Sequence, residues 1–385
     1  MKEWKEYRLG ELAKFSNGIN FDKNAYFGSG IRLITVSDFG NNFSPDYESL
    51  IEVSNEVVKD KDLILKNDIL FVRSNGNKEL VGRCMLIDNV DKPTTYSGFC
   101  IKCHFDNENV SDPKYFTYYF KNQYFRKCIS NASGGTNIQN LNQEILSKHK
   151  VQLPPLPTQQ KIASILSAYD KLIQNYKKQI EALQTAASEL YKEWFVRFRF
   201  PGYQNTRFEN GIPEGWKVVL ASELGEFVRG KNITAEEMQE GTIPVISAGI
   251  EPSGFHNQSN VNGVSLTISN SGANAGYLQI NYSDIWAADC SYCNDSKYIY
   301  FYYELLNNMR VVLFNLQKGA AQPHVYAKDI NKMKILLPPS DLIETADNKI
   351  KLMHEKIYSL QQQIANLTQQ RDLLLPRLMS GKLEV

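Results

Sequence analysis

Two parts of the chain carry the same sequence pattern, and this internal repeat limits the possible folds more than any other feature. Residues 4–15 (WKEYRLGELAKF) are echoed 212 residues later by residues 216–227 (WKVVLASELGEF). A second echo closes each copy, because residues 151–155 are matched 184 residues later by residues 335–339. The copies are therefore alike at their ends and diverged between them. This pattern predicts one scaffold used twice, with a different surface in each middle.

A long helical pattern follows the Pro-Pro pair that ends each copy. The residue before a proline is disfavoured in a helix, so the chain should be extended as far as each pair. Apolar residues then recur every three or four positions, which predicts two helices of roughly 35 residues, each about 50 Å long. Arg371 interrupts the second stripe, and we expect Pro376 to limit that helix.

The apolar stripes allow two interpretations. A single amphipathic helix usually packs against its own domain, but two long stripes in one chain favour pairing of the two helices. The predicted seam residues are Ile162, Tyr169, Leu172, Tyr176, Leu183, Leu190, Ile350, Ile357, Leu360, Ile364 and Leu367.

The segments between these landmarks are typical of mixed strand and helix. Residues 31–36, 68–73 and 84–87 predict strands, because β-branched and apolar residues are bounded there by Gly, Asn and Asp. Residues 114–122 and 297–307 predict aromatic-rich helices. Each copy is therefore expected to be an α/β module of about 150 residues.

The charge and hydropathy of the chain argue against a protein that attracts a polyanion through its overall charge, and against a membrane protein. The chain has 385 residues and a formal net charge of only +1, so any surface for a polyanion must be a local group of Lys and Arg. It shows no leader-like start and no apolar run long enough to span a bilayer, which predicts a cytoplasmic protein without membrane association.

Two Cys-x-x-Cys pairs raise the possibility of zinc. Cys100/Cys103 and Cys290/Cys293 lie in corresponding parts of the two copies. A structural zinc would need all four thiolates to converge from separate domains, and no further Cys or His is suitably spaced. We favour small buried residues in strands, whose positions i and i+3 face opposite sides, and expect no metal.

Other catalytic patterns are weak. Gly225-x-x-x-x-Gly230-Lys231 resembles a phosphate-binding loop, but Asn232 stands where a Ser or Thr would hold magnesium, so a turn glycine is the better interpretation. The five histidines share no spacing with a nucleophile. The Asn/Asp-Pro-Pro-aromatic loop of amino-methyltransferases is missing, and so are nuclease-type acidic clusters. The sequence therefore predicts no catalytic residues.

Polar loops occur at matching places in both copies, one pair directly after a predicted strand and another shortly before the closing Pro-Pro strand. Their Arg, Lys and Asn side chains suit the edges of DNA bases, and their Gly and Ser residues allow close approach to phosphate. Ordinary solvated hairpin loops are the alternative. The candidate DNA-binding residues are Arg73, Ser74, Asn75, Thr136, Asn137, Gln139, Ser269, Asn270, Asn274, Gln322 and His324, with Arg32, Lys78, Arg229 and Lys231 as phosphate contacts.

Four motifs in order give the chain its resemblance to a known family. They are residues 4–15 with the echo 212–216 (IPEGW), then 153–162 (LPPLPTQQKI), 190–196 (LYKEWFV) and 374–383 (LLPRLMSGKL). With these motifs the chain resembles, over essentially its full length, the specificity subunits of type I restriction-modification systems. The second closing segment, 338–341 (PPSD), departs from the pattern because it lacks the Thr-Gln-Gln-Lys of the first copy.

The resemblance implies two homologous α/β target recognition domains, residues 1–157 and 201–339. It implies that residues 158–200 and 340–385 form long helices that pair as an antiparallel coiled coil, a ruler between the halves of a bipartite asymmetric DNA site.

The partners that the resemblance implies are double-stranded DNA, two modification subunits that methylate adenine N6 and, in some systems, restriction subunits. S-adenosylmethionine, ATP and magnesium would belong to those partners, and this chain would carry no cofactor and no catalytic activity. A stand-alone methyltransferase or nuclease, and a coiled-coil scaffold that does not bind DNA, are the alternatives.

Overall fold

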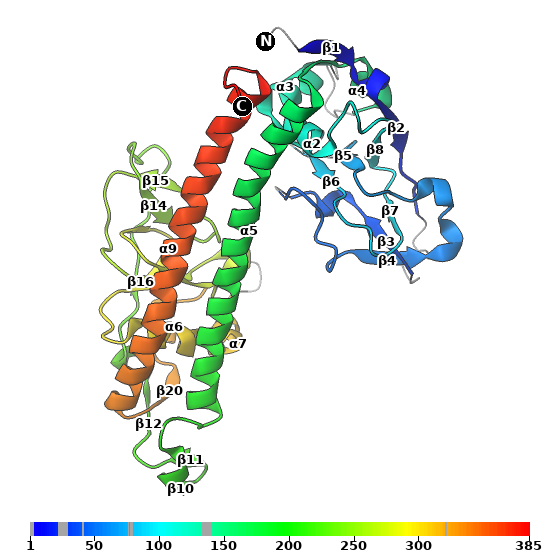
Figure 1. The fold of residues 1–385 in the computed structure, drawn as a ribbon. Helices are drawn as coiled ribbons and strands as arrows, with labels where there is room; N and C mark the ends of the chain where they lie inside the picture. The colour runs from blue at the N-terminus through cyan, green and yellow to red at the C-terminus, as the bar shows by residue number, and fades with distance from the viewer. Residues whose placement is uncertain are drawn as a thin grey trace. The chain divides into compact units, whose positions relative to one another are not determined.

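The structure, a computed structural model, describes residues 4–21, 30–40, 42–75, 77, 80–132, 141–319 and 322–385. Contacts divide the chain into two compact units (Figure 1): unit 1 comprises Met1–Gln174 and Ile364–Val385, and unit 2 comprises Asn175–Gln363. The boundaries predicted above follow the sequence repeat. The division by contacts instead shares each long helix between the two units.

Unit 1 is built from three antiparallel or mixed strand groups with short helices between them. The closing pair is β1 (Lys5–Arg8) with β9 (Lys150–Leu153). The four-stranded sheet has the order β2 (Ala13–Asn17), β8 (Cys100–Phe105), β5 (Ile69–Val72), β6 (Cys84–Leu86), and the three-stranded sheet has the order β4 (Ile51–Ser54), β3 (Gly30–Ile34), β7 (Thr94–Tyr96). The short helices are α1 (Leu9–Leu12), α2 (Pro113–Lys121), α3 (Gln123–Ala132) and α4 (Gln143–Lys148).

Unit 2 repeats this plan with shorter connections. Its closing pair is β12 (Lys217–Leu220) with β20 (Lys334–Leu337). The four-stranded sheet has the order β13 (Val228–Arg229), β19 (Cys290–Cys293), β16 (Ser265–Ser269), β17 (Leu278–Asn281), and the three-stranded sheet has the order β15 (Gly254–His256), β14 (Ile243–Ile246), β18 (Trp286–Ala287). The helices are α6 (Ile299–Asn308), α7 (Arg310–Asn315) and α8 (Ala327–Asn331), and a small hairpin, β10 (Phe208–Glu209) with β11 (Ile212–Pro213), precedes them.

The register of the strands confirms that the units are repeats. Lys5 pairs with Leu153 in unit 1, and Lys217 pairs with Leu337 in unit 2, as the two sequence offsets require. In both three-stranded sheets the central strand has one antiparallel and one parallel neighbour. The predicted strands and aromatic helices in the middles are also confirmed, to within one or two residues at most ends.

Aromatic side chains from the helices fill the core of each unit. In unit 1, Phe120 of α2 lies with its ring centroid 4.9 Å from that of Phe71 on β5. In unit 2, Phe301 and Tyr302 of α6 are fully buried in the largest apolar cluster. Burying side chains of this size provides much of the apolar free energy that holds a helix on a sheet.

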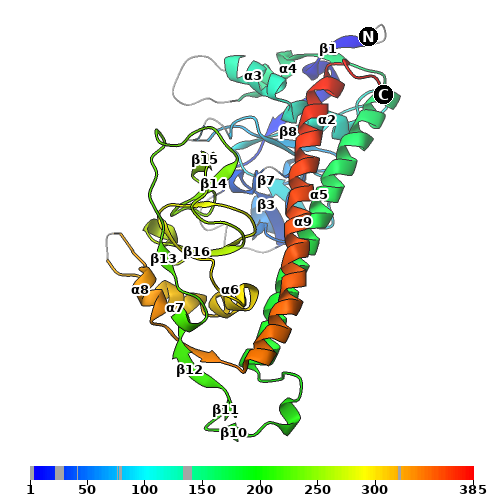
Figure 2. The same cartoon turned by 90° about the vertical axis from the view of Figure 1, so that its left-hand side faces the viewer.

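The long helices α5 (Leu156–Tyr191) and α9 (Ser340–Met379) pair antiparallel within each unit, as Figure 1 and Figure 2 show. In unit 1, Ile162 near the start of α5 shares a buried cluster with Leu378 near the end of α9. In unit 2, Ala187 near the end of α5 shares one with Ala346 near the start of α9.

Polar groups that are half-buried in unit 1 and buried in unit 2 join the helices to the sheets. In unit 1, Arg371 of α9 forms an ion pair with Asp170 of α5, which also accepts a hydrogen bond from the hydroxyl of Tyr118. In unit 2, His354 of α9 lies between Glu304, at 3.3 Å, and the Tyr282 hydroxyl, at 2.8 Å. The residues Asp170 and His354 are equivalent under the 184-residue offset.

Two details of the helix prediction are corrected by the structure. Leu172, predicted in the seam, is 37% exposed, and its neighbour Ile173 is 7% exposed instead. Helix α9 does not end at Pro376 but continues to Met379. A proline removes one helical hydrogen bond, and burial of Leu378 and Met379 in the core of unit 1 offsets that loss.

The other predicted seam residues have varied burial. Ile162, Ile350, Ile357 and Leu360 are buried. The remainder are half-buried, namely Tyr169, Tyr176, Leu183, Leu190, Ile364 and Leu367.

Gln159 explains why the two copies differ at the base of their helices. Its side chain is fully buried, accepts a hydrogen bond from the Asp112 amide and donates to the carbonyl oxygens of Val110 and Pro154. In unit 2 the equivalent position under the 184-residue offset is Ile343, a buried residue of the apolar core. The Thr-Gln-Gln-Lys motif of the first copy thus has a structural role within unit 1.

Replacing Gln159 by alanine should remove three hydrogen bonds and leave buried backbone groups without partners. We expect the Gln159→Ala variant to lose about 3 kcal/mol of unfolding free energy, measured by urea denaturation. The exposed neighbour Gln160 provides the control, because Gln160→Ala should change the stability by less than about 0.5 kcal/mol. Equal stability of both variants would contradict the role given to Gln159.

Candidate functional site

Three segments of unit 2 that are far apart in the sequence meet at one place. The amide of Val325 donates to the Asn270 carbonyl at 2.9 Å, and the amide of Gly272 donates to the Pro323 carbonyl at 3.1 Å. These bonds join the loop after β16 to the loop that ends near His324. The end of β13 joins them through β19, because the Gly230 amide donates to the Cys290 carbonyl at 2.8 Å.

A layer of buried polar side chains supports the meeting point. Ser291 donates through its hydroxyl to the side-chain oxygen of Asn270 at 2.7 Å, and Ser271 donates to the Asp289 carboxylate. Ser269 donates to the Ala248 carbonyl at 3.0 Å. Ser269 and Asn270, both predicted to bind DNA, are 3% and 5% exposed, so in this structure they shape the loops from beneath.

The surface above this layer carries cations and amides. Arg229, Lys231 and Gln322 are exposed, and Asn274 and His324 are half-buried. The Arg229 guanidinium lies 4.0 Å from the Asp289 carboxylate, and the Lys231 amine lies 6.0 Å from the centroid of the Trp286 ring. These are weak restraints, and most of the hydrogen-bonding capacity of both cations remains available to a ligand.

Unit 1 has the same arrangement of backbone contacts. The Leu141 amide donates to the Arg73 carbonyl at 2.9 Å, as Val325 does to Asn270, and the Gly18 amide donates to the Cys100 carbonyl at 3.2 Å, as Gly230 does to Cys290. The loop after β5, the end of β2 and the chain before α4 therefore meet as their counterparts do in unit 2.

The side chains at the unit 1 meeting point differ from those of unit 2. Arg73 is half-buried and its guanidinium donates to the Gly98 carbonyl at 3.4 Å. Ser74 and Asn75 are half-buried. Four further predicted residues, Lys78, Thr136, Asn137 and Gln139, lie outside the described residues.

Arg32 is placed differently from our expectation of a phosphate contact. It lies in β3, is 6% exposed and forms an ion pair with Asp91. The hydrogen bond from Arg32 lowers the pKa of the Asp91 carboxyl, so this pair stays charged. A buried guanidinium that is already paired is poorly placed to neutralise a ligand, and Arg32 is left out of the site.

The four Cys-x-x-Cys cysteines are buried core residues. Cys100 and Cys103 of β8 lie in different apolar clusters, on opposite faces of the sheet, and so do Cys290 and Cys293 of β19. Burial raises the pKa of the Cys100, Cys290 and Cys293 thiols to about 12. In the described part of the chain, no three His, Cys, Asp or Glu side chains are grouped to hold a metal ion.

Comparison with known proteins decides the family. Residues 1–185 and 213–373 match the family model described as "Type I restriction modification DNA specificity domain". The chain belongs to this family. It is therefore a DNA-recognition subunit, and catalysis in such systems is carried by other subunits.

Individual relatives agree with this assignment. The "Type I restriction enzyme MjaIX specificity subunit" of Methanocaldococcus jannaschii is 27% identical, over 100% of this chain and 94% of that protein. The "Type I restriction enzyme HindI specificity subunit" of Haemophilus influenzae is 24% identical, over the full length of both chains.

A solved structure shares the fold. The type I S subunit from M. genitalium has a TM-score of 0.65 at 19% sequence identity, covering 97% of this chain and 96% of that one. Among the described residues, no helix has the length and apolar content needed to cross a bilayer.

Several residues of the candidate site in unit 2 could not be singled out from the sequence. Asp289 and Ser291 organise the loops of unit 2 from β19 and its approach, and Trp286 flanks Lys231. Asp289 and Ser291 flank Cys290 in the sequence. This alternation of polar and apolar residues could have indicated that both polar side chains lie on the face of the strand opposite Cys290. Their loop partners lie 18 and 21 residues away, which no local pattern reveals.

Gly18 and Gly230 are equivalent, and close backbone approach explains both. A Cβ on Gly18 would lie 2.3 Å from the Ser97 carbonyl oxygen, and one on Gly230 would lie 2.5 Å from that of Ala288. Gly230 therefore belongs to a strand-end contact, which supports the interpretation of this glycine as structural.

Adding a methyl group at either position should push the end of the strand away from its neighbour. We expect Gly18→Ala and Gly230→Ala each to lose about 1–3 kcal/mol of unfolding free energy in urea denaturation. Gly40→Ala is the matched control, because its Cβ would meet no atom closer than 3.9 Å. A loss in the Gly40→Ala variant as large as in the other two would contradict the steric explanation.

Proposed function

We propose that each unit recognises one half of a bipartite asymmetric DNA site, and that the chain thereby directs adenine N6 methylation by two modification subunits. The observation that carries this proposal is the same meeting of three segments in both units, with different side chains on top. A shared backbone frame with different surface groups suits two half-sites of different sequence.

The chemistry of the unit 2 surface suits DNA. Exposed Arg229 and Lys231 would contact phosphates and set the register of the protein on the duplex. Asn274, Gln322 and His324 would approach base edges, where a bidentate amide contact discriminates by about 1–3 kcal/mol. The buried layer under them keeps the loops in place, which lowers the entropy cost of binding.

In unit 1 the corresponding contacts are proposed for Arg73, Ser74 and Asn75. Lys78, Thr136, Asn137 and Gln139 remain part of the proposal on the strength of their sequence position.

The catalytic cofactors belong to the partners in this proposal. S-adenosylmethionine would be bound by the modification subunits, and ATP and magnesium by restriction subunits where a host has them. The lengths of α5 and α9 would set the number of base pairs between the two half-sites.

Neutralising the exposed cations should weaken binding to all duplexes in a salt-dependent way. We expect Arg229→Gln and Lys231→Gln each to reduce the slope of log affinity against log salt concentration by about 0.9, because each phosphate contact releases counterions. Fluorescence anisotropy over a salt series measures this slope. Lys297→Gln, which removes an exposed cation paired with Glu344, is the control and should leave the slope unchanged.

Single-molecule sequencing of genomic DNA tests the function itself. Cells that carry this chain with its modification subunit should methylate a split adenine motif that cells lacking the chain leave unmethylated. Exchanging residues 270–276 and 318–324 for those of a relative should change one half of the motif only. Unaltered methylation without the chain, in the presence of an active modification subunit, would refute the proposal.

A further inference from the structure

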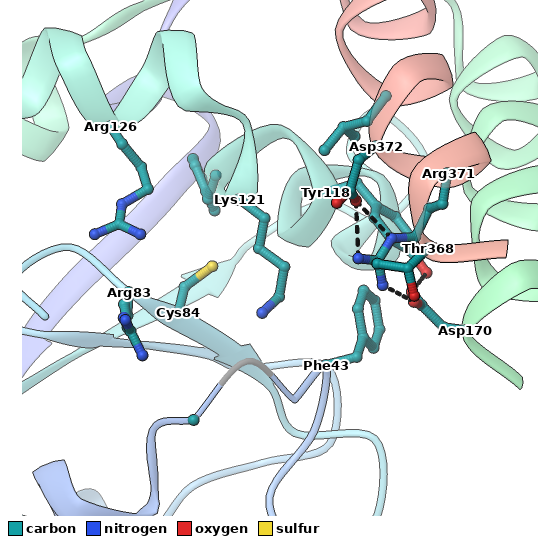
Figure 3. A pocket seen from close by; sticks show the side chains of 13 residues that line it. Phe43, Arg83, Cys84, Tyr118, Lys121, Arg126, Asp170, Thr368, Arg371 and Asp372 are labelled. Atoms are coloured by element: carbon teal, nitrogen blue, oxygen red, sulfur yellow. Dashed lines mark hydrogen bonds and ion pairs between the residues drawn. The ribbon is translucent and has the colours of Figure 1, made fainter. Parts of the chain in front are cut away.

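Unit 1 contains a cavity of about 300 Å³ whose lining is rich in charged side chains (Figure 3). It is lined by β6, the end of α2, and α3, together with the unit 1 parts of α5 and α9. Four cations face it, Arg83, Lys121, Arg126 and Arg371. This cavity is separate from the loop surface described above.

The carboxylates of the cavity are already engaged. Arg371 forms ion pairs with both Asp170 and Asp372, and Asp170 also accepts the hydrogen bond of Tyr118. Figure 3 shows this group on one side of the cavity, with Arg83, Lys121 and Arg126 on the other. Arg371 therefore pairs with both carboxylates that line the cavity.

Two of the other lining cations, Lys121 and Arg83, are paired less completely than Arg371 among the described residues. The Lys121 amine donates to the Asn42 carbonyl at 2.8 Å, and Arg83 has a buried Nε atom without a hydrogen-bond partner. Within the residues that the structure describes, neither side chain forms an ion pair. Burial lowers the pKa of Lys121, and the neighbouring positive charges of Arg371 and Arg126 act in the same direction.

A bound anion would pair with Lys121 and Arg83 and so offset the cost of burying their charges. Buried charges are costly unless they are paired, and a buried guanidinium donor without an acceptor adds to the cost. Arginine and lysine together bind the oxygens of phosphate through short charge-assisted hydrogen bonds. Because the cavity has a volume of about 300 Å³, it can take a phosphate group with part of the molecule that carries it.

We propose that this cavity of unit 1 binds a phosphate group, held by Lys121 and Arg83 with Arg126 beside them. The phosphate could come from a free anion or from the backbone of the bound duplex, and the chemistry of recognition is the same. The free-anion form is independent of the function proposed above, whereas the backbone form rests on it.

The first experiment titrates inorganic phosphate into the full chain in phosphate-free buffer, by calorimetry and by thermal unfolding. Lys121→Met should weaken phosphate binding at least about tenfold, because it removes a charge-assisted contact. The same variant should unfold at an equal or higher temperature without phosphate, since the cost of burying the ammonium disappears. A merely structural lysine would give a lower unfolding temperature.

The matched control is Lys127→Gln, which removes an exposed cation from α3 next to Arg126. It should leave phosphate affinity unchanged. Arg83→Gln should weaken phosphate binding as Lys121→Met does.

The second experiment measures duplex affinity of the same variants. If Lys121→Met weakens duplex binding and inorganic phosphate competes with DNA, the phosphate group comes from the backbone. If Lys121→Met loses phosphate binding and keeps full duplex affinity, the ligand is a free phosphate. Phosphate binding by a chain that binds no duplex would support this inference while the proposed function failed. If Lys121→Met changes neither phosphate nor duplex binding, the inference is overturned.

Discussion

The antiparallel pairing of the first and last strands of each unit is the contact on which the rest of the structure depends. It joins residues 144 positions apart in unit 1, where the Lys150 amine also binds the Glu6 carboxylate. The same pairing brings the Leu9 amide to the His149 carbonyl, and the Ala221 amide to the Met333 carbonyl in unit 2. The entropy of closing such a long loop is lost once, and every sheet contact inside the loop then forms at lower cost. The last strand also delivers the chain directly into a long helix.

The surface formed by the meeting loops of each unit depends on this pairing of the first and last strands. Val325 and Leu141 lie shortly before the closing strands, and each donates a backbone hydrogen bond to the loop that follows a central strand. Backbone contacts of this kind are independent of side-chain identity, so the side chains above them can change without loss of the frame. The buried polar layer of unit 2, with Asn270 and Asp289, fixes the loop further.

The sequence alone predicted the parts of the fold that have a local signal. Apolar periodicity located α5 and α9, and β-branched runs bounded by Gly and Asn located the strands of unit 1. The prediction was wrong for residues whose burial or pairing depends on a partner far away in the sequence. Arg32 resembled a free cation because Asp91 lies 59 residues further along the chain, and Ser269 and Asn270 resembled surface residues because their burial depends on neighbouring loops. Pro376 was expected to end its helix, but α9 continues to Met379 because Leu378 and Met379 pack into the core of unit 1.

The polar contacts between the helices and the sheets affect what happens when related chains exchange segments by recombination. Unit 1 is assembled from two stretches of chain, and its Asp170–Arg371 pair joins one stretch to the other. The equivalent place in unit 2 is occupied by His354 with Glu304, a pair of different side chains. A recombination event that replaces only the first 174 residues would therefore set a new partner against the old Arg371. Such an exchange would preserve this ion pair only where the incoming residue at position 170 is also acidic.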